Sequence, residues 1–301
     1  MFSGALNQTA CKNLFNPSFA QREGGFDIAF RALPANGEKP FHAFFQRIDT
    51  SGQLDGDLVD LSTRFQTELG YPVADPKICT LDNETWLTFN TGHFQRPNNI
   101  YLVRLSPEPS QLYRVDYFER RNIEKNWAFF LRDGVLHALY DLDPLTVLRE
   151  SNRRDGVISF ERLQARNLSG EGPDPKASKT PKLTIGTQLA GIGSSPDSYV
   201  LVAHRRFYWR GKRIYLGKPV RFDAGRDGFS VRFSPDVWAH SLSALAGSKP
   251  KHNPNLLSCT YFSGIMVSND HATLGYGVND VGHSIAQIPL SRWPKAHSSA
   301  I

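Results

Sequence analysis

The chain has 301 residues, of which 40% are hydrophobic and 12% aromatic, and its formal net charge is +6. This apolar content is enough for a large core, and the length fits one closed all-β domain as well as two smaller domains. The positive charge favours an anionic partner, such as phosphate, a nucleotide sugar, an acidic glycan or nucleic acid. Three cysteines at long spacing argue against a disulfide framework and indicate a reducing compartment.

The two ends of the chain carry few signals. Residues 1–8 have no basic start and no apolar run of signal-peptide length. No stretch of the sequence approaches the roughly 20 apolar residues of a membrane span. We therefore expect a cytoplasmic protein without a membrane span, in which residues 1–14 form a loose lead-in and residues 294–301 a C-terminal tail.

From residue 16 onward the sequence predicts one hairpin after another. In the clearest unit, residues 71–90, a proline turn carrying Asp75 leads into a short apolar segment that reverses and returns through Trp86 and Phe89. This is the pattern of a strand, a tight turn and a second strand. Variants of the unit occur five times, with turns at Gly24-Gly25, Asp82-Asn83, Asp133-Gly134, Pro196-Asp197 and Asn269-Asp270.

Other segments complete or connect these units. Residues 41–47 are expected to pair with the first unit, and residues 99–105 alternate as a strand does. Residues 55–69 are predicted as a short helix or a loop. The polar section from Glu150 to Lys176 is predicted as a mobile loop, and residues 241–258 as a long surface connection. Such long loops often shape a binding mouth.

The turns fall roughly 50 to 75 residues apart, close to the period of propeller blades with loop insertions. We therefore predict an all-β fold, a single-domain five-bladed β-propeller over residues 15–293. Five blades closed in a ring leave few exposed sheet edges and bring one strand end per blade to a central axis.

Short motifs at the starts and ends of the units resemble those of a known family. They are Phe15–Ser18, Ala74–Lys77, Glu124–Trp127, Val202–Arg205 and Gly275–Asp280. In this order, over nearly the whole chain, they are similar to the five-bladed propellers around glycoside hydrolase family 130. That family is largely inverting mannoside phosphorylases with some hydrolases, and it has related β-1,2-mannosyltransferases. The resemblance implies a propeller that acts on mannosides.

The resemblance also implies roles for single residues. Asp75 matches the aspartate of the family's Asp-Pro-Arg motif, which serves as the catalytic acid. Lys125 aligns with the start of the third-blade lysine motif, His204 with the fourth-blade histidine, and Asp280 with the last-blade aspartate that contacts sugar hydroxyls. The sequence departs from the family at Lys77, where arginine is usual, and it has a short N-terminus without the family's oligomerising extension.

Chemical reasoning from the residues alone also points to Asp75. Inversion at a glycosidic bond needs a carboxyl group that gives or takes the proton of the bridging oxygen. Asp75 stands at the start of an inner strand and is placed for this role, although Asp before Pro is also a common turn residue. Asp141, Asp143 and Asp280 are further strand-end carboxylates that would hold sugar hydroxyls or water, or else belong to turns and the rim.

The strongest charge feature is the basic and aromatic run from His204 to Arg213. Arginine and lysine donors suit phosphate oxygens, and aromatic faces stack on sugars or bases. The run is therefore a site for phosphate, a nucleoside diphosphate or an anionic glycan, or else a solvated hairpin. Single-stranded nucleic acid is a third alternative, disfavoured because the other charges are mixed along the chain. Tyr276 and Trp127 would stack on a sugar ring or pack in the core.

The sequence thus predicts an enzyme that makes or breaks a glycosidic bond with inversion, as a glycosyltransferase or glycoside phosphorylase using a phosphorylated donor or phosphate. Basic residues at the expected mouth favour transfer over hydrolysis. The alternatives are a glycoside hydrolase of the same fold and a non-catalytic propeller that binds glycan or protein. No cofactor, metal or nucleic acid is expected, and the partners are an oligosaccharide or glycan with phosphate or a nucleotide sugar. Besides catalytic Asp75, the predicted substrate-binding residues are Asn16, Arg31, Lys125, Asn126, Trp127, His204, Arg205, Tyr276 and Asp280.

Overall fold

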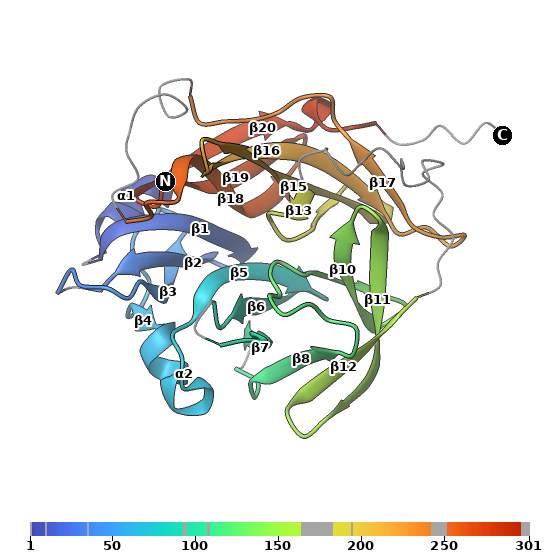
Figure 1. Cartoon of the computed structure of the whole chain (residues 1–301), viewed down its shortest axis with the longest axis horizontal. Coiled ribbons are helices and arrows are strands. Elements are labelled where there is room, and N and C mark those ends of the chain that lie inside the picture. The colour runs from blue at the N-terminus through green and yellow to red at the C-terminus, as the bar shows by residue number, and fades with distance from the viewer. Residues whose placement is uncertain are drawn as a thin grey trace.

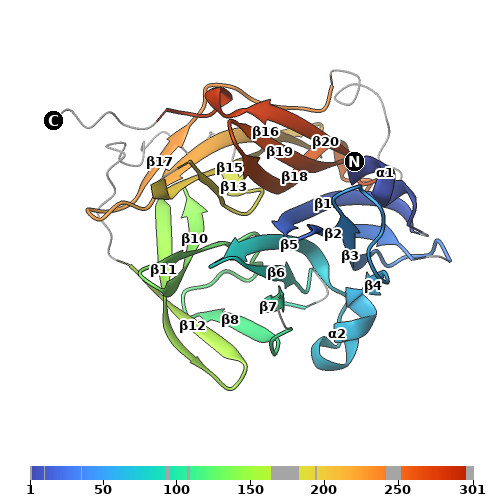
Figure 2. The same cartoon turned by 180° about the vertical axis from the view of Figure 1, so that it is seen from behind.

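The computed structural model describes residues 2–9, 11–34, 36–92, 95–106, 109–163, 183–193, 195–241 and 252–295. Over these ranges the protein is nearly all β, and its strands lie in groups around a common centre (Figure 1; seen from behind in Figure 2). The helices are short: α1 (Phe2–Asn7), α2 (Leu61–Leu69) and the 3-10 turn η2 (Leu290–Arg292). No helix among the described residues has the length and apolarity to cross a membrane.

Five strand groups follow one another along the chain. The first contains β1 (Lys12–Arg22), β2 (Gly25–Leu33), β3 (His42–Asp49) and β4 (Val59–Asp60). The second contains β5 (Ala74–Leu81), β6 (Glu84–Asn90), β7 (Ile100–Ser106) and β8 (Tyr113–Tyr117). The third contains β9 (Ala128–Arg132), β10 (Val135–Leu142), β11 (Leu145–Arg154) and β12 (Val157–Arg162). The fourth contains β13 (Leu183–Ile185), β14 (Ala190–Ile192), β15 (Ser195–Trp209), β16 (Lys212–Asp223) and β17 (Ser230–Phe233), and the fifth contains β18 (Leu256–Ser268), β19 (His271–Val278) and β20 (Gly282–Pro289).

Within each group the strands pair antiparallel, and two parallel pairs join neighbouring groups. β8 pairs with β12, and β16 pairs with β18. As a result the five groups form one four-stranded and two eight-stranded sheets by hydrogen bonding. The antiparallel pairs match hairpin connections, whereas the parallel pairs mark where the edge of one group meets the edge of another.

Four of the five predicted turns are confirmed, and the fourth is misplaced. Pro196 and Asp197 lie inside β15 rather than in the turn. The chain reverses earlier, because Ile192 of β14 is already paired with Ser195. Gly193, with φ of 61°, supplies the left-handed residue that the reversal needs.

The structure also corrects two predicted loops. The section after Glu150 is not a loop up to residue 162, because β11 and β12 run through it and bury Ile158 and Phe160. Two alternating apolar residues are enough to fix one face of a strand whose other face is solvated. The lead-in is not loose, since α1 buries Ala5 and Leu6. Residues 164–182 and 242–251 lie outside the described residues, and the last three residues of the second predicted loop, Leu256–Ser258, belong to β18.

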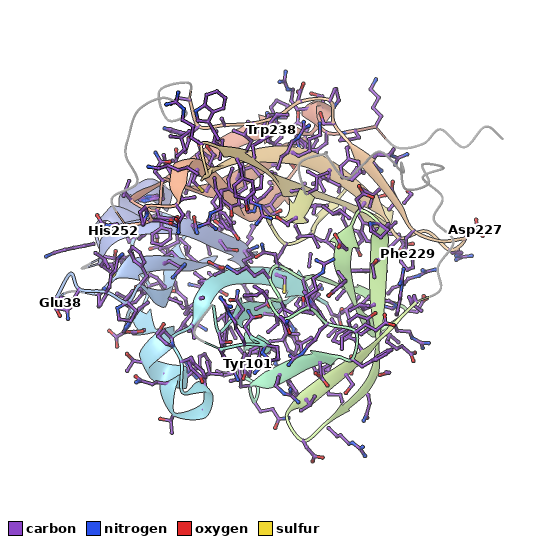
Figure 3. The ribbon with its side chains drawn as sticks, in the orientation of Figure 1. Glu38, Tyr101, Asp227, Phe229, Trp238 and His252 are labelled. Carbon is purple, nitrogen blue, oxygen red and sulfur yellow. The ribbon has the colours of Figure 1, made fainter. Side chains whose placement is uncertain are left out.

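Hydrophobic clusters fill the spaces between neighbouring groups. Each of the five clusters among the described residues joins side chains from two groups, as when Trp127, just before β9, packs against Tyr117 of β8. Figure 3 shows the same distribution, with Phe229 inside the molecule and Asp227 and Glu38 at its periphery. Face-to-face packing of this kind holds the inner strands at fixed positions around the centre.

The first group packs against the last. The Ser263 hydroxyl of β18 donates to the Pro17 carbonyl of β1 at 2.8 Å. Glycines make this close approach possible, since a Cβ at Gly275 would lie 2.5 Å from the Pro17 oxygen and one at Gly277 would lie 2.0 Å from Asn16 Oδ1. Figures 1 and 2 both show β1 beside β18 and β19.

Candidate active site

A cavity of about 550 Å³ lies where the inner ends of all five groups meet. Its lining mixes five cationic side chains with three carboxylates, together with tyrosines and carboxamides. The residues that carry its chemistry are Asn16, Arg31, Asp75, Arg121, Glu124, Lys125, Asn126, Tyr140, His204, Arg206, Arg213, Tyr215, Asn253, Tyr261 and Asp280.

Left-handed backbone at the same place in three groups aims polar side chains at this cavity. Asn16, Asp75 and Asn126 have φ of 53°, 50° and 63°. The first two sit at irregularities in the β1–β2 and β5–β6 ladders, where the strand is kinked. Asparagine and aspartate tolerate this conformation better than other residues with a Cβ. Such strained positions cluster at functional sites, where the fold holds a side chain in one direction.

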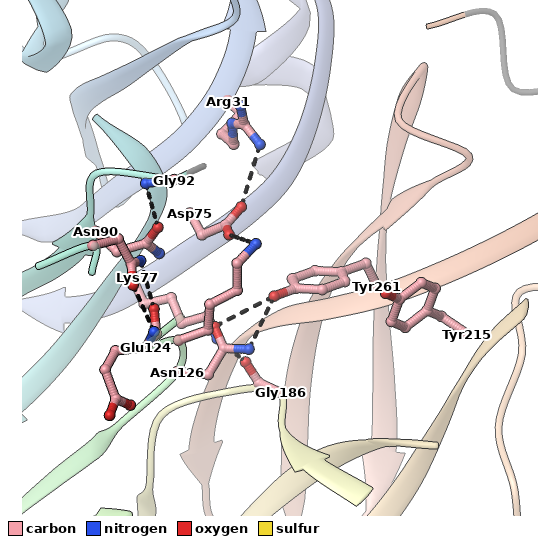
Figure 4. Close-up of polar contacts among 12 residues, drawn as sticks. Arg31, Asp75, Lys77, Asn90, Gly92, Glu124, Asn126, Gly186, Tyr215 and Tyr261 are labelled. Atoms are coloured by element: carbon pink, nitrogen blue, oxygen red, sulfur yellow. Dashed lines mark hydrogen bonds and ion pairs between the residues drawn. The ribbon is translucent and has the colours of Figure 1, made fainter. Parts of the chain in front are cut away.

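Asp75 is bracketed by cations. Arg31 Nη1 lies 3.2 Å from Asp75 Oδ1 (Figure 4). Lys125 Nζ lies 3.5 Å from Asp75 Oδ2. Burial would raise the pKa of the Asp75 carboxyl, but Lys125, Arg31 and Lys77 together bring this pKa well below its usual range. The Asp75 carboxyl is therefore ionised at neutral pH.

Lys77 lies directly behind Asp75 and is only 2% exposed. It donates to Asn126 Oδ1 at 2.7 Å and to the Gly186 carbonyl, so it links the second, third and fourth groups. Burial lowers the pKa of Lys77, the charge of Asp75 opposes this shift and that of Lys125 adds to it, and the resulting pKa is about 7. At this position the motif that the sequence resembles usually has arginine, and this chain has instead a lysine whose pKa lies near neutral pH.

A histidine and a tyrosine complete the inner wall. His204 Nε2 donates to the Phe262 carbonyl at 2.9 Å, and its ring centroid lies 3.9 Å from that of Tyr261. Burial lowers the pKa of His204 to about 3, so the ring is neutral at physiological pH. Asn126 Nδ2 donates to the Tyr261 hydroxyl at 3.2 Å, which fixes the Asn126 carboxamide at the cavity wall (Figure 4).

The other two carboxylates of the cavity differ from Asp75. Glu124 accepts from the Trp127 indole at 3.0 Å and the Tyr140 hydroxyl at 2.8 Å, and also from a backbone amide, so its oxygens are engaged. Burial raises the pKa of Asp280; Arg31 opposes that shift and the charge of Asp75 adds to it. Asp280 is therefore a second carboxyl of the lining, hydrogen-bonded to Asn253, whose pKa is shifted in the opposite direction from that of Asp75.

Seven predicted site residues line the cavity: Asn16, Arg31, Asp75, Lys125, Asn126, His204 and Asp280. The other three lie elsewhere. Trp127 packs against Tyr140 and the core of the second and third groups, and Tyr276 packs against Phe262. Arg205 lies over the ring of Phe207 on the opposite face of β15 from His204. The two aromatic side chains lie in the core because burial of their ring area is favourable. Arg205 points away from the cavity because side chains alternate between the two faces of a strand.

Several lining residues were not selected from the sequence. Arg206 is two residues from His204 and so shares its face of the strand, a signal that would have chosen it over Arg205. Tyr261 and Tyr215 come from strands far apart in the sequence and carried no local signal. No cluster of three or more His, Cys, Asp or Glu with metal-binding geometry occurs within the described ranges.

Comparisons with known proteins give a likeness of fold. No protein-family model and no curated protein sequence matches the chain. Solved structures match over most of its length. One, from work on the GH130 family of mannoside phosphorylases and its hydrolases that target β-1,2-mannosidic linkages, has a TM-score of 0.59 at 14% identity, covering 97% of this chain and 89% of that one.

Two further structures give the same picture. A mannose phosphorylase from Leishmania mexicana, in complex with a phosphate ion, has a TM-score of 0.55 at 16% identity, covering 92% of this chain and 83% of the other. A β-1,2-mannobiose phosphorylase from Listeria innocua, in complex with β-1,2-mannobiose, has a TM-score of 0.55 at 11% identity, covering 93% and 90%. The resemblance to glycoside hydrolase family 130 inferred from short motifs thus extends to the three-dimensional fold.

Proposed function

We propose that residues 15–293 form a single five-bladed β-propeller whose central cavity holds a mannoside. Each strand group corresponds to one blade, and the parallel pairs β8–β12 and β16–β18 are contacts between the edges of adjacent blades. The mannoside is proposed because structures of the same fold include phosphorylases named for mannose and β-1,2-mannobiose. A central cavity with a residue from every blade is the usual place for a propeller's site.

The proposed activity is inverting transfer of a mannosyl unit between phosphate and a sugar hydroxyl. The observation that carries it is the ionised Asp75 held between Arg31 and Lys125 at the cavity wall. An ionised carboxylate is a base. In the synthetic direction, the acceptor hydroxyl attacks the anomeric carbon of a mannosyl phosphate, the bond from that carbon to the phosphate oxygen breaks, and phosphate leaves with the electron pair. Asp75 takes the acceptor proton, and attack from the opposite face inverts the anomeric centre.

The reverse reaction requires a protonated Asp75. Phosphate bound near Arg31 and Lys125 weakens their interaction with Asp75 and places further negative charge beside it. Both effects raise the pKa of Asp75. The phosphate oxygen then attacks the anomeric carbon while Asp75 gives its proton to the departing glycosidic oxygen. Phosphate binding thus converts Asp75 from a base into the acid needed for phosphorolysis.

The remaining lining residues bind the two substrates. Arg206 and Arg213 add guanidinium donors that suit phosphate oxygens. Asn16 and Asn126 present carboxamides, and Asp280 a carboxylate, all of which suit sugar hydroxyls. A transferase that uses a nucleotide sugar would need the same cations and remains the closest variant of this proposal.

One observation favours a second candidate, a glycoside hydrolase. An inverting hydrolase needs two carboxyl groups with a water between them, one acting as acid and the other as base. Asp280 supplies a second carboxylate in the same cavity, with its pKa shifted in the opposite direction from that of Asp75. A hydrolase has no need of an anion site, so the cationic lining favours the phosphorylase.

A substrate panel tests the proposal. The protein is incubated with β-1,2-mannobiose with and without phosphate, and with mannose plus either mannosyl phosphate or a nucleotide mannose, and products are followed by chromatography. Phosphate-dependent release of mannosyl phosphate is the expected result. Mannose release without phosphate identifies the hydrolase, product only from the nucleotide sugar identifies the transferase, and binding without any product identifies a non-catalytic propeller.

A further inference from the structure

The hairpin formed by β15 and β16 ends in two exposed aromatic side chains. Tyr208 is 61% exposed and Trp209 is 60% exposed, among the largest values for apolar side chains in the described part of the protein. They belong to the basic and aromatic run from His204 to Arg213, but neither of them takes part in the proposed reaction. Exposed aromatics beside arginines on a carbohydrate-binding protein suggest a contact surface.

The two aromatics lie on opposite faces of the hairpin. Side chains alternate along β15, so His204, Arg206 and Tyr208 share one face, and Trp209 lies on the other. The ladder register places Tyr215 opposite Arg206 and Arg213 opposite Tyr208.

One face of the hairpin therefore continues the cavity wall. His204, Arg206, Arg213 and Tyr215 all line the cavity, and each shares its face with Tyr208. Figure 4 shows Tyr215 beside Tyr261 at the inner end of this wall. Tyr208 is the next position outward, and the Arg206 guanidinium carbon lies 5.5 Å from the centre of its ring.

Exposure increases steadily along this face. His204 is fully buried, Arg206 is partly buried and Tyr208 is exposed. The face thus runs from the centre of the molecule to its surface without a change of side. Its outermost member is an aromatic ring with the Arg206 guanidinium beside it and Arg213 opposite it in the ladder. A sugar ring stacks on an aromatic face, and guanidinium groups donate to its hydroxyls.

We propose that Tyr208, next outward on this face from the cavity residues Arg206 and Arg213, forms an outer sugar-binding site for substrates longer than a disaccharide. This inference rests on the proposed function, because it takes the cavity to hold the reacting mannosyl unit. It adds that the preferred substrate is an oligosaccharide, whose distal units leave the cavity along the hairpin. Trp209, Phe207 and Arg205 face away from this path and take no part.

Trp209 is a matched control for Tyr208, because the two residues are adjacent, are almost equally exposed and lie on opposite faces of the hairpin. We would measure the affinity of wild type, Tyr208→Ala and Trp209→Ala for β-1,2-linked mannobiose and mannotetraose by calorimetry. Circular dichroism and thermal unfolding check that both variants are folded, which exposure of the two side chains favours.

The expected result is a difference between the two chain lengths. Tyr208→Ala lowers the ratio of mannotetraose affinity to mannobiose affinity by roughly three- to tenfold, the range expected for one aromatic stacking contact. Trp209→Ala leaves this ratio as in wild type. An unchanged ratio in Tyr208→Ala, an equal fall in Trp209→Ala, or a wild-type protein that binds neither oligosaccharide would overturn the outer site.

The same samples separate this inference from the proposed function. A length-dependent loss of affinity in Tyr208→Ala without turnover of mannobiose and phosphate leaves the outer site standing and removes the phosphorylase. Turnover of mannobiose with an unchanged affinity ratio keeps the phosphorylase and removes the outer site.

Discussion

Asp75 and Asp280 line the same cavity from the second and fifth strand groups, and both have left-handed backbone, with φ of 50° and 56°. Their pKa values are shifted in opposite directions. Burial raises both, but Lys125, Arg31 and Lys77 outweigh it at Asp75, whereas burial outweighs Arg31 at Asp280. The comparison teaches that the placing of cations, more than burial, decides the direction in which the pKa of each carboxyl is shifted. Two carboxylates with divergent pKa values are the usual arrangement for separate acid and base roles.

The largest expected effect comes from Asp75→Asn. Without a carboxylate to move the proton, turnover falls by about a thousandfold, within the range for loss of a general acid or base. Mannobiose affinity changes little, because the amide keeps the shape of the side chain. Steady-state kinetics and calorimetry measure the two quantities.

Asp82→Asn is the matched control for that variant. Asp82 has the same φ of 50° but occupies the outer turn of the same β5–β6 hairpin and is exposed. Its replacement leaves turnover unchanged. Equal turnover in wild type and Asp75→Asn would end the assignment of Asp75 as acid and base.

Lys77→Met tests the cation behind Asp75. The variant leaves the Gly186 carbonyl and Asn126 Oδ1 without their buried donor, which costs roughly 1 to 3 kcal/mol in free energy of unfolding at pH 8. The pKa of Lys77 is about 7 in the folded protein, below the ordinary value of 10.5. Between these values the unfolded chain binds more protons, so the stability contributed by Lys77 rises with pH, by at most about 1.4 kcal/mol per unit.

Chemical denaturation at pH 6 and pH 9 measures this difference. Wild type exceeds Lys77→Met in stability by more at pH 9 than at pH 6. A gap that is constant or shrinks with rising pH would show that Lys77 remains charged. Lys212→Met, at the exposed tip of the β15–β16 hairpin, is expected to show no gap at either pH.

Asp280→Asn tests the role of the second carboxylate of the comparison. If Asp280 only holds sugar hydroxyls, kcat/KM falls by about tenfold, the loss expected for one hydrogen bond to a charged group. Asp270→Asn, in the exposed outer turn before β19, leaves kcat/KM unchanged. A loss at Asp280 as large as that at Asp75 would instead give Asp280 an acid–base role of its own and favour the hydrolase.

The smallest effect is expected from Lys125→Met, as a shift along the pH axis. Removing the cation 3.5 Å from Asp75 raises the pKa of that carboxyl. Synthetic activity requires ionised Asp75 and is lost as pH falls through this pKa, so the acidic limb of the kcat/KM profile moves to higher pH. An acidic limb in the same place as that of wild type would assign the control of Asp75 to Arg31 alone.

The outer ends of the hairpins were more predictable than the inner ends. Turns such as Asp82-Asn83 and Asn269-Asp270 carry their signal locally, because residues with left-handed φ are few. The side of β15 on which Arg205 lies depended on the exact strand register, since a shift of one residue moves every side chain to the other face of the strand. Tyr261 was missed for a different reason: its hydroxyl meets Asn126 across 135 residues of sequence, a contact made only by the complete fold.

The close approach of Gly277 to Asn16 has a consequence for biosynthesis. The chain emerges from the ribosome in sequence order, so Asn16 and Pro17 are made long before the glycines and Ser263 that pack against them. A nascent chain can form its early hairpins, but it possesses no complete pocket until residue 280 has been released. Loop closure over such a span is slow, which exposes the edge of β1 to chaperones or to other nascent chains during translation.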